Sequence, residues 1–227
     1  MAFFQGPNIV RDGLVFAYDA GSTRCYSGTG TTAKNIIDST TGTLTNGVAF
    51  NSANGGFWEF DGTNDYIVIS NANSPQFIAN QAFTISYIVY LNRVTGTYMA
   101  PVMKGSFPSS YGHLIGAGNL FIVYTDDDSS PEFSISNMLD NDINKWVFIT
   151  QTYDGDKIYV YRNGVLEGQS GAGVTFTVNT SNLYIGSNNS TNYYLDGNMA
   201  NLKIYDKALT TAEVLQNYNA YKSRFGL

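Results

Sequence analysis

Residues 146–168 constrain the fold most, because three short apolar stretches follow one another there with a turn dipeptide after each of the first two. The stretches are 146–153, 157–162 and 165–168, and the dipeptides are Asp154-Gly155 and Asn163-Gly164. Asp-Gly and Asn-Gly accept the positive φ angles that tight hairpin turns require. The segment therefore predicts three consecutive antiparallel strands.

A second strand signal lies at 82–91, where apolar residues alternate with others. One face would carry Phe83, Ile85, Tyr87, Val89 and Leu91. A period of two is typical of a strand with one buried face. The opposite face begins polar but ends with Ile88 and Tyr90, so we expect a loop or a partner to cover that end.

The rest of the chain contains many more short strand candidates separated by turn-forming residues. Aromatic residues make up 15% of the chain, which suits pleated, half-buried surfaces. Between residues 20 and 56 large apolar side chains are sparse, so we expect long loops with short strands there. The further strands are expected at 14–18, 35–37, 47–50, 57–60, 66–69, 112–115, 120–124, 132–135, 174–178, 183–186 and 198–205.

The period changes near the end of the chain, which predicts one short helix over 210–225. Thr210 can cap it, with Glu213 closing a capping box, and Leu209 can pack on Val214. Gly226 can terminate the helix. Its buried face would carry Val214, Tyr218, Tyr221 and Phe225.

Charge and composition exclude several functional classes. The net charge is −6 and the 12 Lys and Arg residues form no cluster, so we expect no nucleic-acid partner. No run of about 18 apolar residues exists, so we expect no membrane span, and the first residues do not resemble a signal peptide. Cys25 and His113 are the single residues of their types, which rules out a disulfide within the chain and a Cys/His zinc site. We expect His113 at the surface of a sheet.

The ordered motifs of residues 57–216 resemble the laminin-G-like branch of the concanavalin A-like lectin/glucanase superfamily. They are FDGTNDYIVI, FTISYIVYL, WVFITQTYDG, KIYVYRNGVLEG, LYIGS and YLDGNMANLKIYDKALTTAEV. The resemblance implies an all-β fold, a two-sheet antiparallel jelly-roll sandwich with one short C-terminal helix. We expect an N-terminal arm at 1–12 and the jelly-roll domain at 13–227.

The two ends of the chain resemble domains of tailed-bacteriophage structural proteins. The similar segments are 6–32 and 209–227. This resemblance implies a virion module that contacts neighbouring virion proteins or copies of itself as a homo-oligomer. Related modules also occur in secreted bacterial proteins, so an extracellular carbohydrate-binding module is the alternative.

Catalysis is not expected. Glucanases of this fold carry a closely spaced carboxylate array of the form E-x-D-x-x-E, and this sequence has none. Glu59 and Asp61 would share a strand face, but no third carboxylate follows at the needed spacing. His113 is not near a Gly-x-Ser-x-Gly motif either, so a nucleophilic triad is unsupported. The chain is therefore predicted not to be an enzyme.

Two aspartates in matching motifs are the candidates for a metal site. Many relatives carry calcium beside their loops, and Asp61 and Asp196 stand in the FDG and LDG motifs. The alternative is that both make turn hydrogen bonds to backbone amides, and we favour it. Residues 126–128 are three adjacent aspartates and more typical of a solvated loop. We therefore expect no cofactor, with calcium the one that the motifs would allow.

Sugar contacts are expected where tyrosines stand beside amides on a loop. Sugars stack on exposed aromatic rings, and Asn side chains read hydroxyl groups. Tyr193 and Tyr194 beside Asn189 and Asn192 form the main candidate. Tyr98 and Tyr111 are further candidates, although most of the 17 tyrosines must simply cover sheet faces.

Partner contacts are expected at the N-terminal arm. Phe3 and Phe4 form an apolar pair in an extended segment that Pro7 keeps out of a helix. Such a pair is suited to dock on a neighbouring subunit. These residues are therefore the candidates for oligomer or virion contacts.

Overall fold

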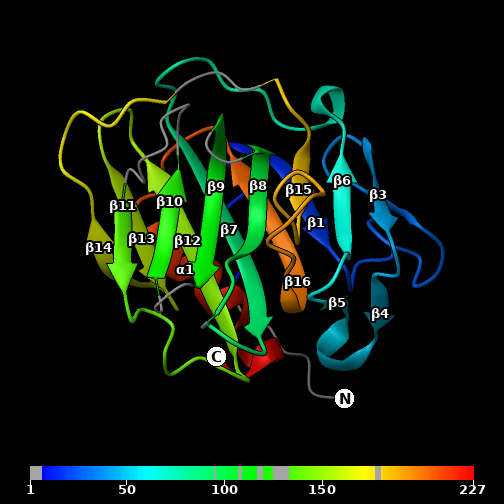
Figure 1. The fold of residues 1–227 in the computed structure, drawn as a ribbon. Helices are drawn as coiled ribbons and strands as arrows, with labels where there is room; N and C mark the ends of the chain where they lie inside the picture. The colour runs from blue at the N-terminus through cyan, green and yellow to red at the C-terminus, as the bar shows by residue number, and fades with distance from the viewer. Residues whose placement is uncertain (1–6, 95, 107–108, 117–119, 125–132, 177–179) are drawn as a thin grey trace.

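The computed structural model contains two antiparallel sheets packed face to face, with one helix behind one of them (Figure 1). It describes residues 7–94, 96–106, 109–116, 120–124, 133–176 and 180–227. The expected fold, a two-sheet β-sandwich jelly roll with one C-terminal helix, is confirmed. No helix in the described part of the chain is both long and apolar enough to cross a bilayer.

The first sheet, sheet A, has eight strands. Across the sheet these are β14 (Val165–Gln169), β13 (Ile158–Arg162), β12 (Trp146–Tyr153), β7 (Phe83–Leu91), β16 (Asp196–Tyr205), β5 (Phe57–Asp61) and β4 (Ala49–Asn51), with β1 (Leu14–Asp19) also paired to β16. The meander predicted from 146–168 is β12, β13 and β14. Asn163 and Gly164 both have positive φ, at 51° and 79°, as that hairpin turn requires.

The second sheet, sheet B, also has eight strands and faces the viewer in Figure 1. In spatial order they are β11 (Phe133–Ser136), β10 (Leu120–Tyr124), β9 (Ser109–Gly116), β8 (Met99–Ser106), β15 (Leu183–Ile185), β6 (Tyr66–Ile69), β3 (Thr41–Thr45) and β2 (Thr32–Lys34). Two short 3-10 turns, η1 (Ala53–Gly55) and η2 (Asn71–Asn73), lie in the connections. Hairpins of consecutive strands form both ends of this sheet, whereas its centre pairs distant segments, with β15 between β8 and β6.

The main core lies between the sheets and is rich in aromatic rings. The predicted inner face of β7 is buried there, including Phe83 and Tyr87. Trp58 and Tyr18 meet with ring centroids 6.1 Å apart. Fully burying side chains of this size stabilises the fold by about 1.5–3 kcal/mol each.

Helix α1 (Thr211–Phe225) covers the outer face of sheet A and has the ends that the sequence predicts. Thr210 Oγ1 accepts a hydrogen bond from the Glu213 amide at 3.3 Å, and Glu213 Oε2 accepts one from the Thr210 amide at 2.8 Å. Gly226 ends the helix in the left-handed conformation. Phe225 packs with Ile88, so the apolar end of the second face of β7 is covered by this helix rather than by a loop or a partner.

The N-terminal segment is attached to this helix from residue 8 onward. The Val10 amide donates to Asn217 Oδ1 at 2.8 Å, and Gln216 Nε2 donates to the Asn8 carbonyl at 2.7 Å. Tyr205 Oη also donates to the Val10 carbonyl at 3.2 Å. Residues 8–10 of the expected arm thus pack against the domain.

Two of the expected strands are absent from the described part of the chain, and β2, β3 and β8 were not expected. Residues 35–37 form a turn, because Asn35 Oδ1 accepts hydrogen bonds from the Ala17 and Ile37 amides. Residues 174–176 are not in a strand, and 177–178 lie outside the described residues. The sequence also gave no signal for β8, since Pro101 and Lys104 interrupt its alternation; the register shifts between Met99 and Val102, and such an irregularity accommodates a proline.

Candidate functional site

The outer faces of the two sheets differ in what lies over them. Helix α1 packs on sheet A, whereas tyrosine side chains gather over sheet B. Tyr66 and Val68 point outward from β6 because Ile67 and Ile69 point into the core. Tyr184 points outward from β15 in the same way, and its ring centroid lies 6.0 Å from that of Tyr66.

A second tyrosine pair lies over β8 on the same face. Tyr98 and Tyr193 meet edge to face, with centroids 5.6 Å apart and an interplanar angle of 75°. Both rings are half-buried and pack on the outward residues Ala100 and Met103. The Ala100 amide donates to the Tyr193 carbonyl at 2.7 Å, which fixes the loop after β15 against β8. Tyr193 and Tyr98, both selected from the sequence, are therefore brought together.

The loop that carries Tyr193 is a tight asparagine-rich turn. The Asn188 amide donates to the Asn192 carbonyl at 3.0 Å, and Asn188 Nδ2 donates to Asn192 Oδ1 at 2.8 Å. Asn189 has a φ of 51° and a half-exposed side chain. Tyr194 Oη donates to the Ser190 carbonyl at 2.8 Å, so its hydroxyl is used to hold the turn. The loop is therefore a rigid platform that presents Asn189, Asn192 and Tyr193 next to the sheet.

We define the tyrosine face as Tyr66, Tyr98, Tyr184, Tyr193 and Tyr194. Sequence analysis selected three of these and missed Tyr66 and Tyr184. The signal was available for Tyr66, because the alternation over 66–69 already placed it opposite two isoleucines. Tyr184 lies in a strand of three residues, too short for its alternation to be informative.

Two expectations about individual side chains were wrong. Tyr111, a candidate for sugar contact, faces the core between the sheets. His113 lies in a strand as expected, but its ring is also in the core, with Nε2 2.6 Å from Gln151 Oε1 and Nδ1 3.1 Å from Tyr87 Oη. Burial lowers the pKa of His113 to about 4, against the opposing effect of the Gln151 hydrogen bond, so the ring is neutral near pH 7. Both side chains point inward because the register of β9 places every second residue there.

Asp61 and Asp196, the two candidate metal ligands, lie directly opposite each other across β5 and β16. Asp61 Oδ1 accepts hydrogen bonds from the Thr63 and Asn64 amides at 2.8 and 3.2 Å. Asp196 Oδ1 accepts one from Asn92 Nδ2 at 2.7 Å, and its Oδ2 lies 3.3 Å from Arg93 Nε. Each carboxylate is thus engaged by protein groups, and among the described residues no three acidic, His or Cys side chains are grouped as metal ligands would be. That calcium is dispensable remains a prediction.

The carboxylate pair considered for catalysis is also engaged. Glu59 Oε1 accepts a hydrogen bond from Asn51 Nδ2 at 2.9 Å. Desolvation raises the pKa of Asp61, but hydrogen bonds from the Thr63 and Asn64 amides outweigh it and hold this pKa below its usual range. A general acid for glycoside cleavage needs the opposite shift. Both carboxylates thus accept hydrogen bonds within the fold.

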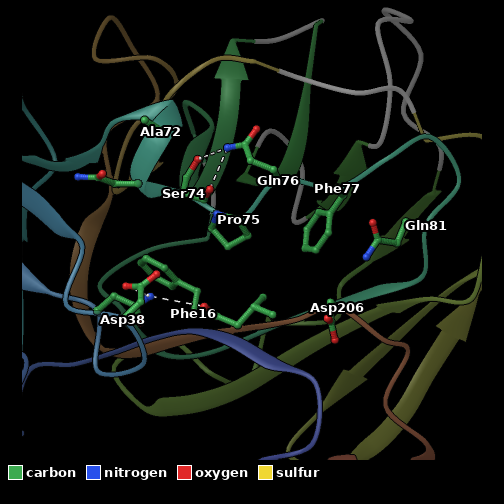
Figure 2. Close-up of a pocket in the computed structure, with 12 residues that line it drawn as sticks. Phe16, Asp38, Ala72, Ser74, Pro75, Gln76, Phe77, Gln81 and Asp206 are labelled. Atoms are coloured by element: carbon green, nitrogen blue, oxygen red, sulfur yellow. Dashed lines mark hydrogen bonds between the residues drawn. The ribbon is translucent and has the colours of Figure 1, made fainter.

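A pocket of about 300 Å³ lies at one end of the sandwich, between the start of β1 and the segment after η2 (Figure 2). Its polar groups bind one another: Gln76 Nε2 donates to the Ser74 carbonyl at 2.8 Å, as the dashed lines of Figure 2 show. The rings of Phe16 and Phe77 that line it are buried, and Phe77 stacks on Phe83 with centroids 5.1 Å apart. The pocket therefore provides polar edges but no ring face for stacking.

Two groups of candidate residues lie outside the described part of the chain. Phe3 and Phe4, the expected partner contacts, belong to residues 1–6. The aspartates 126–128, the weaker metal candidate, also fall there. Their roles remain predictions.

A family model described as concanavalin A-like lectin/glucanases superfamily matches residues 61–215. The chain belongs to this superfamily. The matched range includes all five residues of the tyrosine face. No curated protein sequence matches the chain.

Solved structures of several kinds share the fold. The binding domain of Paraclostridial mosquitocidal protein 1 has a TM-score of 0.72 at 19% identity, over 92% of this chain and 52% of that one. Domain 4 of AbnA, an extracellular arabinanase from Geobacillus stearothermophilus, in complex with arabinotriose, has a TM-score of 0.65 at 17% identity, over 94% and 100%. A Trypanosoma rangeli sialidase has a TM-score of 0.65 at 16% identity, over 96% of this chain and 35% of the enzyme. The chain thus spans about half of the mosquitocidal domain and about a third of the sialidase.

Proposed function

We propose that this chain is a non-catalytic carbohydrate-binding module and that the tyrosine face is its sugar site. The observation that carries the proposal is the half-buried pair Tyr98 and Tyr193, held edge to face beside an asparagine-rich loop. Tyrosine offers an apolar ring for the C–H face of a sugar and a hydroxyl for its polar edge. Because packing already fixes both rings, little side-chain entropy is lost on binding.

The loop amides supply the polar half of such a site. Asn189 is half-exposed. Asn192 is exposed, and its Oδ1 accepts a hydrogen bond from Asn188 Nδ2, which leaves its Nδ2 as a donor. A side-chain amide both donates and accepts, which matches a sugar hydroxyl. Asn189 and Asn192 therefore orient the sugar through hydrogen bonds, while its C–H face stacks on the tyrosine rings.

The module is proposed to bind without cleaving. Asp61 and Glu59 are bound by other protein groups, and the lowered pKa of Asp61 suits an acceptor. The domain of the arabinanase that resembles this chain over its whole length holds arabinotriose, which makes arabinotriose a reasonable first probe. We expect no new reducing ends on incubation with laminarin, agarose, cellulose or arabinan.

The test is a glycan array followed by calorimetry on the best ligand and on arabinotriose. Tyr193→Ala should weaken binding at least tenfold, because stacking on this ring is lost. Tyr90→Ala is the matched control, since Tyr90 is also half-buried in an edge-to-face pair, with Trp146 at 5.5 Å, but lies on sheet A. Equal loss in both variants, or no glycan bound by the wild type, would contradict the proposal.

The second candidate, a virion structural module, rests on the resemblance of segments 6–32 and 209–227. In that case the module contacts virion proteins or its own copies through Phe3 and Phe4, and its location is the virion rather than the extracellular space. Residues 8–10 are fixed on α1, so deletion of residues 1–6 removes the pair without disturbing Val10. The truncated chain should then lose self-association in light scattering and cosedimentation with particles. If both chains are monomeric and neither cosediments, the virion role fails and the sugar-binding module stands alone.

A further inference from the structure

A second pocket, of about 320 Å³, lies on the helix side of the molecule, well away from the tyrosine face. It is bounded by residues 9–19, which include β1, by the turn at Ile36 and Ile37, by Lys203 of β16 and by Tyr221 of α1. We call it the β1–α1 pocket. Its size is at the lower end of the range for small-molecule sites.

Lys203 at this pocket is buried without a hydrogen-bond partner. Its side chain is 2% exposed, and its Nζ finds no acceptor in the described part of the chain. The Nζ lies 4.1 Å from the centre of the Tyr221 ring, a cation–π contact that compensates only part of the lost hydration. A buried ammonium group in this state favours an anion as a partner.

A neighbouring side chain is buried and unsatisfied in the same way. Asn201 stands two residues before Lys203 in β16 and so lies on the same face of the strand. Both its Oδ1 and its Nδ2 lack partners among the described residues, although the side chain is fully buried. Asn201 is not one of the residues that line the pocket, but two unsatisfied polar side chains on one strand face favour a polar ligand or an ordered water beside them.

The charges around the pocket favour an anion as well. Arg11 and Arg24 line it and are exposed, whereas the chain as a whole has a net charge of −6. Asp19 is the carboxylate at the pocket, and both its oxygens lie 3.1 Å from Arg224 Nη1. Asp19 is shared between Arg224 and the cations of the pocket, so one carboxylate faces Lys203, Arg11, Arg24 and Arg224.

The rest of the lining is apolar. Ile36 is half-buried, and Ile37 is 49% exposed, high for a large aliphatic side chain. Arg24 Nη2 donates to the Ile36 carbonyl at 2.9 Å, which places a guanidinium beside these isoleucines. A ligand that satisfied only the charges would leave the isoleucines in water, so the occupant has an apolar part too.

We propose that the β1–α1 pocket binds a small organic carboxylate with an apolar body. Lys203, with Arg11 and Arg24, holds the carboxylate, and Ile36 and Ile37 take the apolar body. This inference does not depend on the sugar site, because the two lie on different sheets.

The test is a titration with three probes at pH 7 and constant ionic strength, followed by two-dimensional amide NMR. Hexanoate has both the charge and the apolar body, 1-hexanol has the body alone, and inorganic phosphate has the charge alone. We expect hexanoate to bind at least tenfold more tightly than either of the others and to shift the amide signals of Ile36 and Ile37.

Variants then assign the contacts. Lys203→Met keeps the length of the side chain and should weaken hexanoate binding at least tenfold. Ile37→Asp should also weaken hexanoate binding, because it places a new negative charge at an exposed position. Lys145→Met, an exposed lysine in the turn before β12, is the matched control and should change nothing. The proposal is overturned if no probe binds, if hexanol or phosphate equals hexanoate, or if Lys203→Met binds hexanoate normally.

Discussion

Two lysines of this protein, Lys104 in sheet B and Lys203 in sheet A, are almost equally buried, at 1% and 2% exposed, yet their surroundings differ. Lys104 Nζ donates to Asn71 Oδ1 at 2.8 Å, to Ser74 Oγ at 2.5 Å and to the Ser181 carbonyl at 2.9 Å. Lys203 has the Tyr221 ring and no acceptor among the described residues. Burial lowers the pKa of each to about 8.

The difference indicates different roles for the same residue type. Lys104 joins β8 to η2 and to the segment before β15, so its charge is used within the fold. Lys203 Nζ, at the edge of a cavity, has no hydrogen-bond acceptor among the described residues, where only the Tyr221 ring and the charge of Asp19 offset its burial. Such a group costs stability and is typical of a position that serves binding. The comparison can be tested with parallel Met variants of the two lysines.

The largest effect is expected for Lys104→Met. Methionine fills the space but leaves three acceptors without their charged donor, and hydrogen bonds to charged groups contribute about 1.5–3 kcal/mol each. Water and the Gln76 amide can replace part of the lost hydrogen bonding, which reduces the total loss from the three bonds. We therefore expect the free energy of unfolding to fall by about 2–4 kcal/mol. Urea denaturation measures this directly. A loss below about 1 kcal/mol would mean that the bonds to Lys104 contribute little to the fold.

Lys203→Met should have a smaller effect of the opposite sign. Replacing buried charged groups by apolar side chains of similar volume is often neutral or stabilising, by about 1–4 kcal/mol for ion pairs. Because the cation–π contact with Tyr221 is lost, we expect a gain of about 1–2 kcal/mol at pH 7 in the same assay. Destabilisation as large as that of Lys104→Met would show that Lys203 has a structural partner.

The smallest effect is the pH dependence of this gain. The pKa of Lys203 is lowered in the folded state, so between about 8 and the unfolded value of 10.5 the unfolded chain binds more protons and wild-type stability rises with pH. Asp19 raises this pKa and Arg224 lowers it, while Arg11 and Arg24 face the same pocket. The advantage of Lys203→Met should therefore shrink by about 1 kcal/mol between pH 8 and pH 9. A constant advantage over this range would show that Lys203 does not titrate there.

Much of the fold followed from local patterns. The meander 146–168, the alternating strand at 82–91 and the capped helix at 210–225 each obey a rule of period or turn chemistry that operates over fewer than about ten residues. Asp61 in its turn is a similar case, because its bonds go to amides two and three residues away. By contrast, the strand containing Pro101 was missed because a register irregularity, not the local sequence, accommodates the proline.

The candidate sites depended more on tertiary structure. The sequence alone determined that Tyr193, Tyr194, Asn189 and Asn192 lie together, because they share one short loop. Only the folded chain decided that Tyr98 joins Tyr193, that Tyr111 and His113 face the core, and that Lys203 meets Tyr221 across the space between β16 and α1. The physical reason is that burial and partner choice in a sandwich are set by register and sheet packing between distant segments, and a shift of one residue reverses every side chain.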